Sequence, residues 1–279
     1  MSEYRLEELQ KKLVTILEQG NIERPAREAQ LLLMHAYSCD ELWLMMHKND
    51  LLKDVEKILE YAHRRAKNEP LEYITNHVSF YSQEFFIDYG ALIPRPETEL
   101  LIDEVLKRIA NKEETMLFAE VGVGSGIISI VLAQHLVNTK FIAVDISPAA
   151  LKIARENIKR FGLEDRIELR LGSLLEPVNE KIDYLVSNPP YIANDAQLES
   201  NLAYEPQNAL FGGSIGDELI QELLIEFLRR GINYFSCEMG YDQEDKIREF
   251  LKEKSFQSIE FYNDLSGFDR GFTIKAKNE

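Results

Sequence analysis

Apolar residues recur at helical spacing in the first part of the chain. The clearest stripe falls within residues 4–20, where a glycine ends the pattern. Its apolar members are Leu6, Leu9, Leu13, Ile16 and Leu17. Pro25, in a first-turn position, predicts a second helix that continues to Tyr37, and residues 42–46 and 51–65 predict a third and a fourth. The pattern therefore predicts a compact helical bundle, to which we assign residues 1–70.

This bundle contains few titratable groups arranged for chemistry. Its larger apolar side chains include Trp43, Met45 and Met46. We interpret them, with the leucine stripe, as core and not as a ligand site, because apolar residues at helical spacing usually pack inside.

The pattern changes after the bundle. Over residues 71–88, aromatic and β-branched residues alternate with polar ones, which predicts a hairpin, and we assign residues 71–93 to this hairpin and linker. Residues 93–96 form a rigid connector because they contain two prolines, and residues 97–99 then open a helix that continues to Ile109. Arg95, between the prolines, fits either contact with a ligand pocket or a structural ion pair.

Strands and helices alternate in the rest of the chain. Residues 117–121 and 141–145 are typical of buried strands, and residues 127–133 of a helix between them. The alternation continues to residues 242–252, after which residues 257–262 and 271–275 predict two strands with a short connection. This order predicts an α/β fold with a mostly parallel sheet, to which we assign residues 94–279.

A glycine-rich turn, residues 122–126, indicates a nucleotide-binding corner at the carboxyl edge of that sheet. Dinucleotide-binding folds use G-x-G-x-x-G, but here the third glycine, Gly126, comes one position early, and Ile127 stands where glycine or alanine is needed. Asp145, at the tip of the next strand, is placed to accept hydrogen bonds from ribose hydroxyls. Glu120 adds a charge that repels phosphate and suits an amine or a sulfonium. This corner, called the glycine loop below, therefore fits S-adenosylmethionine better than a dinucleotide.

The most informative run is Asn188-Pro189-Pro190-Tyr191, called the elbow below, which follows a predicted strand end at residues 184–187. The two prolines stop the strand, because neither can donate a ladder hydrogen bond. The Asn188 carboxamide oxygen and a neighbouring carbonyl can accept both hydrogens of an –NH2 group. Tyr191 can then pack on the flat face of the planar group that carries this –NH2. The alternative is an ordinary turn in which Asn188 caps its own backbone.

Further segments along the chain belong with these two motifs. They are residues 70–74, Phe80, Phe85, residues 92–99, Tyr204-Glu205-Pro206, Ala209-Leu210, Gly212-Gly213, Glu238-Met239-Gly240, Gln243, Asp264-Leu265 and Asp269-Arg270. Together they resemble the class I S-adenosylmethionine-dependent methyltransferases. More narrowly, the chain is similar to the protein-(glutamine-N5) methyltransferases that modify peptide chain release factors. The likeness runs from about Pro70 to the end, whereas the first part matches in length and helical character.

The resemblance implies a Rossmann-like sheet that ends in an antiparallel hairpin. It also implies methyl transfer from S-adenosylmethionine, which becomes S-adenosylhomocysteine, to N5 of a glutamine in the GGQ-type loop of a release factor. The residues implied to hold the cofactor are Glu120, Gly122, Val123, Gly124, Ser125, Gly126, Asp145, Ile146, Leu174 and Asn188. Those implied to bind the substrate and carry catalysis are Asn188, Pro189, Pro190 and Tyr191. The helical bundle is then either a module that grips the protein substrate, which we favour, or a lid that stabilises the fold.

Three positions depart from the family pattern. Glu120 stands where aspartate is usual, and Asn76 replaces a common glycine. Ser173 replaces an acid often found beside the adenine.

Charge bears on the choice of substrate. The 279 residues include 48 acidic and 32 basic ones, a formal net charge of −16. The same elbow occurs in enzymes that methylate adenine N6 in DNA, and such proteins need a basic surface to neutralise phosphates. The alternative function, an adenine-N6 methyltransferase acting on DNA or RNA, is therefore less favoured. A third hypothesis is a non-catalytic protein-binding module that kept the fold.

The remaining composition indicates an ordinary globular protein. Cys39 and Cys237 are too few for a disulfide framework, and the five histidines show no zinc-ligand spacing. The charged N-terminus does not resemble a signal peptide, and no apolar run is long enough to span a bilayer. We therefore expect reduced thiols, no metal, no membrane partner and a cytoplasmic location.

Overall fold

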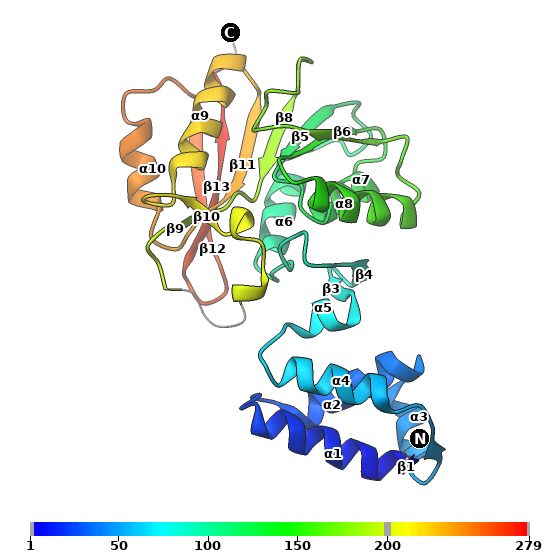
Figure 1. The fold of residues 1–279 in the computed structure, drawn as a ribbon. Coiled ribbons are helices and arrows are strands. Elements are labelled where there is room, and N and C mark those ends of the chain that lie inside the picture. The colour runs from blue at the N-terminus through cyan, green and yellow to red at the C-terminus, as the bar shows by residue number, and fades with distance from the viewer. Residues whose placement is uncertain (1–2, 198–201, 278–279) are drawn as a thin grey trace. The chain divides into compact units, whose positions relative to one another are not determined.

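The computed structural model describes residues 3–197 and 202–277, which group into two compact units (Figure 1). One unit comprises Met1–His77 with Glu199–Tyr204, and the other comprises Val78–Leu198 with Glu205–Glu279. We call the first the helical unit and the second the sheet unit.

The helical unit surrounds an apolar core to which the first helix contributes the predicted stripe. Its described helices are α1 (Leu6–Gln19), α2 (Pro25–Tyr37), α3 (Glu41–Met46), α4 (Glu56–Arg65) and α5 (Leu71–Thr75). All five apolar positions predicted for α1 are buried. A short strand, β1 (Tyr4–Arg5), pairs antiparallel with β2 (Leu51–Leu52).

Two predictions for the helical unit are wrong. The fourth helix begins at Glu56, because residues 51–52 form β2 and Asp54 adopts a left-handed φ of +57° that a helix cannot contain. Met45 and Met46 are 65% and 73% exposed, whereas they were interpreted as core. A helix as short as α3 buries one face, and here that face carries Leu44.

The predicted hairpin is shorter than expected. Residues 71–75 form α5, and the hairpin consists of β3 (His77–Phe80) and β4 (Gln83–Phe86). Asn76 ends α5 in a left-handed conformation with φ +56°, which asparagine tolerates better than most residues. That conformation explains why asparagine can stand where the family commonly has glycine.

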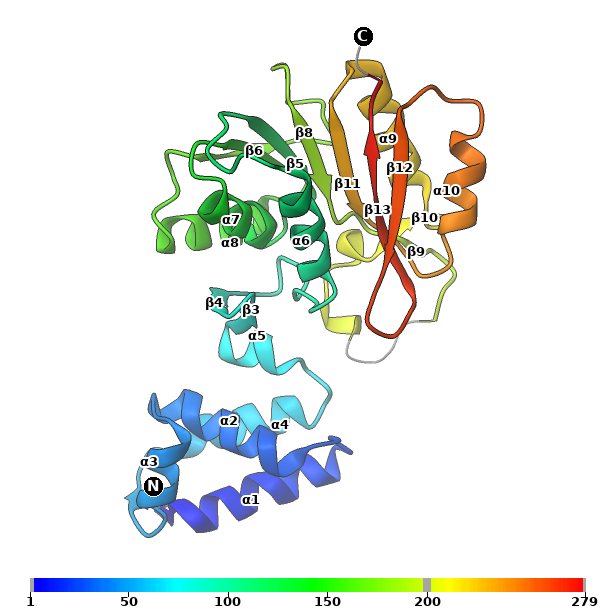
Figure 2. The same cartoon turned by 180° about the vertical axis from the view of Figure 1, so that it is seen from behind.

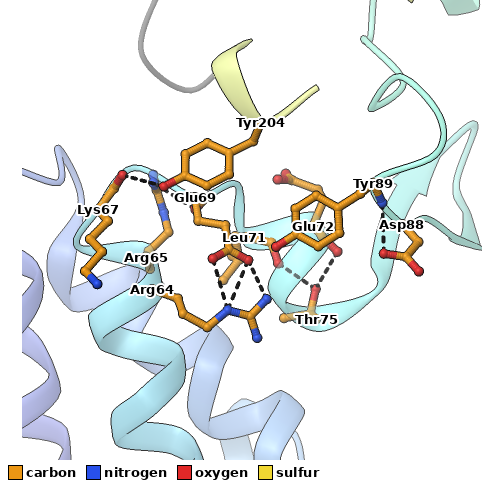
Figure 3. A network of polar contacts seen from close by, with 10 residues as sticks. All are labelled: Arg64, Arg65, Lys67, Glu69, Leu71, Glu72, Thr75, Asp88, Tyr89 and Tyr204. Carbon is orange, nitrogen blue, oxygen red and sulfur yellow. Dashed lines mark hydrogen bonds and ion pairs between the residues drawn. The ribbon is translucent and has the colours of Figure 1, made fainter. Parts of the chain in front are cut away.

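Polar contacts surround the end of α4 within the helical unit (Figure 3). Arg64 Nε donates to both carboxylate oxygens of Glu69, at 3.1 and 3.0 Å. The Tyr204 hydroxyl donates to the carbonyl of Lys67 at 3.0 Å. These bonds attach the segment after α4 and the segment around residue 204 to the same unit.

The sheet unit is built on a seven-stranded sheet with the order β12-β13-β11-β8-β5-β6-β7. The strands are β5 (Leu117–Val121), β6 (Lys140–Asp145), β7 (Ile167–Leu171), β8 (Tyr184–Ser187), β11 (Tyr234–Glu238), β12 (Ser258–Asn263) and β13 (Asp269–Lys275). The pairs from β11 to β7 are parallel, and β13 is antiparallel to both of its neighbours. The predicted fold class and its antiparallel ending are confirmed.

Helices cover both faces of this sheet (Figures 1 and 2). One face carries α6 (Thr98–Arg108), α7 (Ile127–His135) and α8 (Pro148–Arg160), and the other carries α9 (Glu218–Arg230) and α10 (Glu244–Leu251). The core under α9 and α10 includes Leu224, Phe227, Phe235 and Ile247. Because both faces are covered, the central strands are buried along their length, as β8 is at every position.

Two short strands also belong to the sheet unit, in which β9 (Ile192–Ala193) pairs parallel with β10 (Phe211–Gly213). Two 3-10 turns lie between these strands in sequence: η1 (Leu202–Tyr204), which belongs to the helical unit, and η2 (Gln207–Ala209), which belongs to the sheet unit. The hairpin is tied to α8 by Asn157, which accepts from the Phe86 N–H at 2.8 Å and donates to the Phe86 carbonyl at 2.9 Å.

Among the described residues, no helix is both long and apolar enough to cross a bilayer. The same residues contain no group of acidic, histidine or cysteine side chains that could hold a metal ion. Cys39 is half-buried, Cys237 is buried, and both are free thiols.

Candidate active site

A cavity opens at the carboxyl edge of the sheet, where β5, β6 and β8 end. This edge gathers the loops that follow parallel strands, so it brings together motifs that are far apart in sequence. The predicted site residues in its lining are Glu120, Gly122, Val123, Gly124, Ser125, Asp145, Ile146, Leu174, Asn188, Pro189 and Pro190. Two predicted site residues, Gly126 and Tyr191, are not among the described residues that line it.

The glycine loop folds over the end of β6 and approaches the elbow. The N–H groups of Gly122 and Val123 both donate to the Val144 carbonyl, at 2.9 and 3.0 Å. Gly122 has a φ of +75°, and a Cβ at this position would lie 3.6 Å from the backbone oxygen of Asn188. The loop and the elbow therefore form adjacent walls of one cavity.

Gly126 lies at the far end of the loop and caps α7. Its φ is +84°, and a Cβ there would lie 3.3 Å from the Cβ of Ala154 on α8. This glycine lets the two helices pack closely, and its absence from the cavity lining follows from that position.

Asp145 joins the glycine loop to the start of the next helix. One carboxylate oxygen accepts from the N–H of Gly124 and the other from the N–H of Ser147, both at 2.9 Å. Burial raises the pKa of Asp145, while these backbone hydrogen bonds lower it. Each oxygen can accept more than one hydrogen bond, so the carboxylate can also accept from ligand hydroxyls.

Glu120 lies in the cavity wall and is fully buried. Its Oε2 accepts from the backbone N–H and the hydroxyl of Ser129, whereas Oε1 is buried without a hydrogen-bond partner among the described residues. Burial raises the pKa of Glu120 to about 8; the bonds from Ser129 lower it, and nearby Asp145 raises it further. A cationic group in the cavity would favour the charged form of this carboxylate. These two carboxylates thus fit a ligand that carries hydroxyl groups and a positive charge.

The elbow presents Asn188, Pro189 and Pro190 to the cavity. Asn188 Nδ2 donates to Thr98 Oγ1 at 3.1 Å, a contact with a residue 90 positions earlier and not with its own turn. Because Nδ2 is engaged, Oδ1 is the amide atom left to accept a hydrogen bond from a guest. A Cβ on Gly212 would lie 2.2 Å from the Pro190 oxygen, so only glycine lets the β10 segment pack this closely on the elbow.

Tyr191 is turned toward the core and not toward the cavity. Its ring packs against the apolar cluster under α9 and α10, and its hydroxyl donates to Glu238 Oε1 at 3.2 Å. Its carbonyl accepts from Gln243 Nε2 at 3.1 Å. Burial raises the pKa of Tyr191, and the nearby Glu238 raises it further.

Arg95 takes the structural alternative. It forms an ion pair with Glu205, which also accepts from the Ile93 N–H at 3.0 Å. Glu205 is 4% exposed, so the arginine compensates a buried carboxylate and ties the connector to the segment before η2. The connector reaches the cavity through Pro94.

Sequence reasoning missed several cavity residues. They include Thr98, Ser147, Gly172, Asn208, Leu219 and Leu223. Thr98 lay within a segment that carried the family resemblance, which was the available signal. Ser173, noted as a departure from the family pattern, also lines the cavity.

Two family models match the chain. Residues 8–75 match the PrmC N-terminal domain, and residues 95–211 match the methyltransferase small domain. These matches fall on the described helical unit and on the part of the sheet unit that contains the glycine loop and the elbow.

Curated relatives match over nearly the whole chain. The release factor glutamine methyltransferase of Dictyoglomus turgidum is 39% identical over 253 residues, which is 87% of this chain and 88% of the relative. That of Koribacter versatilis is 36% identical over 264 residues, 91% of this chain and 92% of the relative.

Solved structures share the fold. A ribosomal protein L11 methylase from Lactobacillus delbrueckii subsp. bulgaricus is 26% identical, with a TM-score of 0.51 over 69% of this chain and 84% of that one. The hMettl16 catalytic domain in complex with MAT2A 3′UTR hairpin 6 has a TM-score of 0.60 over 83% of this chain and 86% of that one. At 15% identity, the second similarity concerns the fold alone.

Proposed function

The chain belongs to the release factor glutamine methyltransferase family, and on that premise we propose that it methylates N5 of a glutamine in the GGQ-type loop of peptide chain release factors. The methyl donor in this proposal is S-adenosylmethionine. The observation that carries the proposal is that residues 122–125 of the glycine loop, Asp145 and residues 188–190 of the elbow line one cavity.

Three parts of the cavity wall hold the cofactor in this proposal. The glycine loop lies against it, Asp145 accepts hydrogen bonds from its ribose hydroxyls, and Glu120 favours its positive charge. Bound S-adenosylmethionine supplies a methyl group on a positively charged sulfur. Two features of this chain support the assignment. Glu120 Oε1 has no hydrogen-bond partner in the part of the chain that the structure describes, and Gly122, Gly124 and Gly126 have positive φ angles.

The elbow orients the nucleophile. A glutamine amide nitrogen reacts poorly because its lone pair is delocalised into the carbonyl. Asn188 Oδ1 and the Pro189 carbonyl accept the two hydrogens of this –NH2 group, which leans the nitrogen toward tetrahedral geometry. They also favour the positive charge that grows on the nitrogen, and so bind the transition state better than the ground state.

Positioning supplies much of the rate in this scheme. Well-oriented groups gain as much as ~7–11 kcal/mol over freely diffusing ones. The nitrogen loses its proton after it has been alkylated, so we assign no side chain as a general base. The position of Tyr191 supports a role in holding the elbow against the core, and less a direct stacking role on the substrate.

The helical unit is proposed to bind the protein substrate. Its α3 exposes Leu42, Met45 and Met46, although it contributes Leu44 to the core. Exposed apolar clusters of this kind often mark sites of protein contact.

One experiment separates the hypotheses. The protein is incubated with methyl-labelled S-adenosylmethionine and, in parallel, with a release factor, with the same factor carrying alanine for the loop glutamine, and with adenine-containing DNA and RNA. We expect label in the unaltered release factor alone. Label in nucleic acid instead would favour adenine methylation, and cofactor binding without label in any substrate would favour a non-catalytic module.

A further inference from the structure

A buried carboxylate lies behind the elbow, bonded directly to the Tyr191 hydroxyl and connected to Asn188 through Thr98. Glu238, the last residue of β11, is 2% exposed. Its Oε2 accepts from the Thr98 hydroxyl at 2.7 Å, and its Oε1 accepts from the Tyr191 hydroxyl at 3.2 Å. Thr98 in turn accepts from Asn188 Nδ2 at 3.1 Å. One carboxylate thus reaches Asn188 and Tyr191 through different oxygens.

The direction of these hydrogen bonds follows from the chemistry of the groups. An ionised carboxylate can only accept, and a threonine hydroxyl has one hydrogen to donate. When Thr98 donates that hydrogen to Glu238, only its lone pairs remain for Asn188, so they must meet the –NH2 side of the carboxamide. The opposite side, Oδ1, is then held in the orientation that the proposed function requires.

If the Asn188 carboxamide were turned so that Oδ1 and Nδ2 exchanged places, Oδ1 would face the lone pairs of the Thr98 hydroxyl. This alternative orientation is called the flipped carboxamide. The site would then lose a hydrogen bond in a partly buried place, where leaving a polar group unsatisfied is unfavourable. An –NH2 group facing the guest could also not accept the hydrogens of a substrate amide. The carboxamide orientation therefore depends on the charge of Glu238, two hydrogen bonds away.

We propose that Thr98 and Glu238 are positioning residues for methyl transfer, which orient Asn188 through the Thr98 hydroxyl and hold the elbow through Tyr191. The inference rests on the proposed function, in which Asn188 binds the substrate amide. Thr98 and Glu238 come from α6 and β11, so the network also joins two elements to the loop that follows β8.

The surroundings of Glu238 make this orientation sensitive to pH. Burial raises the pKa of Glu238 to about 7, although the hydrogen bonds from Thr98 and Tyr191 and the charge of Arg270 lower it. Glu97 raises it. The other titratable groups that feel its charge are Tyr262 and Cys237, both of which are buried.

Protonation of Glu238 can reverse the direction of the hydrogen bonds that connect it to Asn188. A protonated Glu238 can donate to Thr98, whose own hydrogen is then free to turn toward Asn188 and to favour the flipped carboxamide. Turnover should therefore be present above about pH 7 and fall as the pH is lowered through the pKa of Glu238.

The test compares variants at these two positions with a matched control. T98V removes the hydroxyl, T98S keeps it, and E238Q replaces the carboxylate with a neutral group of the same shape. T273V removes a different buried hydroxyl of the sheet unit, which is bonded to Ser236 at 2.7 Å and lies outside this network. The kcat and KM values for a release factor are measured at saturating cofactor on both sides of neutral pH, and cofactor affinity is measured separately by calorimetry.

We expect T98V to lower kcat by roughly ten- to a hundredfold, as misplacement of a reacting group does, with little change in cofactor affinity. T98S should recover most of that loss. E238Q should be slow at every pH and lack the fall in activity below neutral pH. T273V should keep the wild-type pH profile.

The orientation of Asn188 can also be read without turnover. In the wild type, the side-chain amide proton signals of Asn188 should move in NMR spectra as Glu238 titrates, and this movement should be absent in T98V. Wild-type kcat and pH profile in T98V or E238Q would overturn the positioning role alone. A wild type that transfers no methyl to release factor would overturn the proposed function, and the positioning role with it.

Discussion

Asn188 and Asp145 lie in the wall of the same cavity, but the proposed function gives them separable tasks. In that proposal, Asn188 contacts the substrate amide, whereas Asp145 contacts the ribose of the cofactor. Their substitution should therefore change different measured quantities.

Asn188→Ala should lower kcat by about 10²–10³, which is typical when a transition-state contact is removed, and should leave cofactor affinity largely intact. Asp145→Ala should weaken cofactor binding on the order of tenfold, because hydrogen bonds to the ribose are lost. Release factor methylation and calorimetry measure the two effects. Near-wild-type turnover in the first variant, or unchanged affinity in the second, would refute the corresponding assignment.

Glu120 offers a test in the absence of any substrate. The pKa of this carboxyl is about 8 in the folded protein and 4.5 as the ordinary value. Between these values the folded protein binds a proton that the unfolded chain releases, so the contribution of Glu120 to stability is complete below pH 4.5 and is lost as the pH rises to about 8.

Glu120→Gln should therefore stabilise the cofactor-free protein at about pH 8, by up to a few kcal/mol at roughly 1.4 kcal/mol per pKa unit. The same change should weaken cofactor binding, because the neutral amide cannot favour a cation. Urea unfolding at about pH 5 and about pH 8 measures the first effect and calorimetry the second. If the variant were less stable than the wild type at the higher pH, burial of the charged Glu120 would not be the destabilising factor assigned here.

At the scale of elements, some helices and strands follow from local sequence signals, whereas the bounds of others depend on tertiary contacts. The predicted helix at residues 25–37 and the predicted strand at residues 117–121 match α2 and β5. Proline at a helix start and a short apolar run before glycine act over a few residues, so such elements can be predicted locally. The start of α4 could not, because residues 51–52 pair with β1 and the left-handed Asp54 interrupts the helical pattern.

The exposed face of α3 gives a prediction for the helical unit. If this unit binds the substrate, M45E with M46E places two charges on the apolar face that would contact the release factor. The double variant should then raise the KM for release factor by roughly three- to tenfold and leave kcat unchanged, because a few interface residues usually carry most of the binding energy. Val137→Glu places the same charge on an exposed apolar residue of the sheet unit and is the matched control. An unchanged KM in the double variant would favour a unit that only stabilises the fold.

At the scale of the whole molecule, the net charge of −16 shapes the encounter with a partner. If the partner is a release factor with a basic surface patch, that patch would be attracted to this acidic protein. Charged surfaces separated by more than a Debye length are screened by salt.

We therefore expect the KM for release factor to rise as the ionic strength increases from about 0.05 M to about 0.3 M, with kcat nearly constant. Affinity for duplex DNA should be weak throughout this range. Steady-state kinetics and a DNA-binding assay measure these effects. Tight DNA binding that weakens steeply with salt would reverse the substrate assignment, since that dependence reports phosphate contacts.

The sequence by itself determined the motifs whose geometry is local. Glycines with positive φ shape the loop after β5, and two prolines end β8, because both constraints operate on the backbone of the residue concerned. The alternation of strands and helices determined the fold class and, with it, the sheet edge at which these motifs meet.

Only the tertiary structure decided which side chains hold the elbow in place. The partners of Asn188 and Tyr191 are Thr98 and Glu238, which lie 140 positions apart and carry no periodic signal that links them. Arg95 likewise finds Glu205 110 positions later. Side-chain hydrogen bonds depend on where packed helices and strands bring their ends together, and that placement is a property of the folded core.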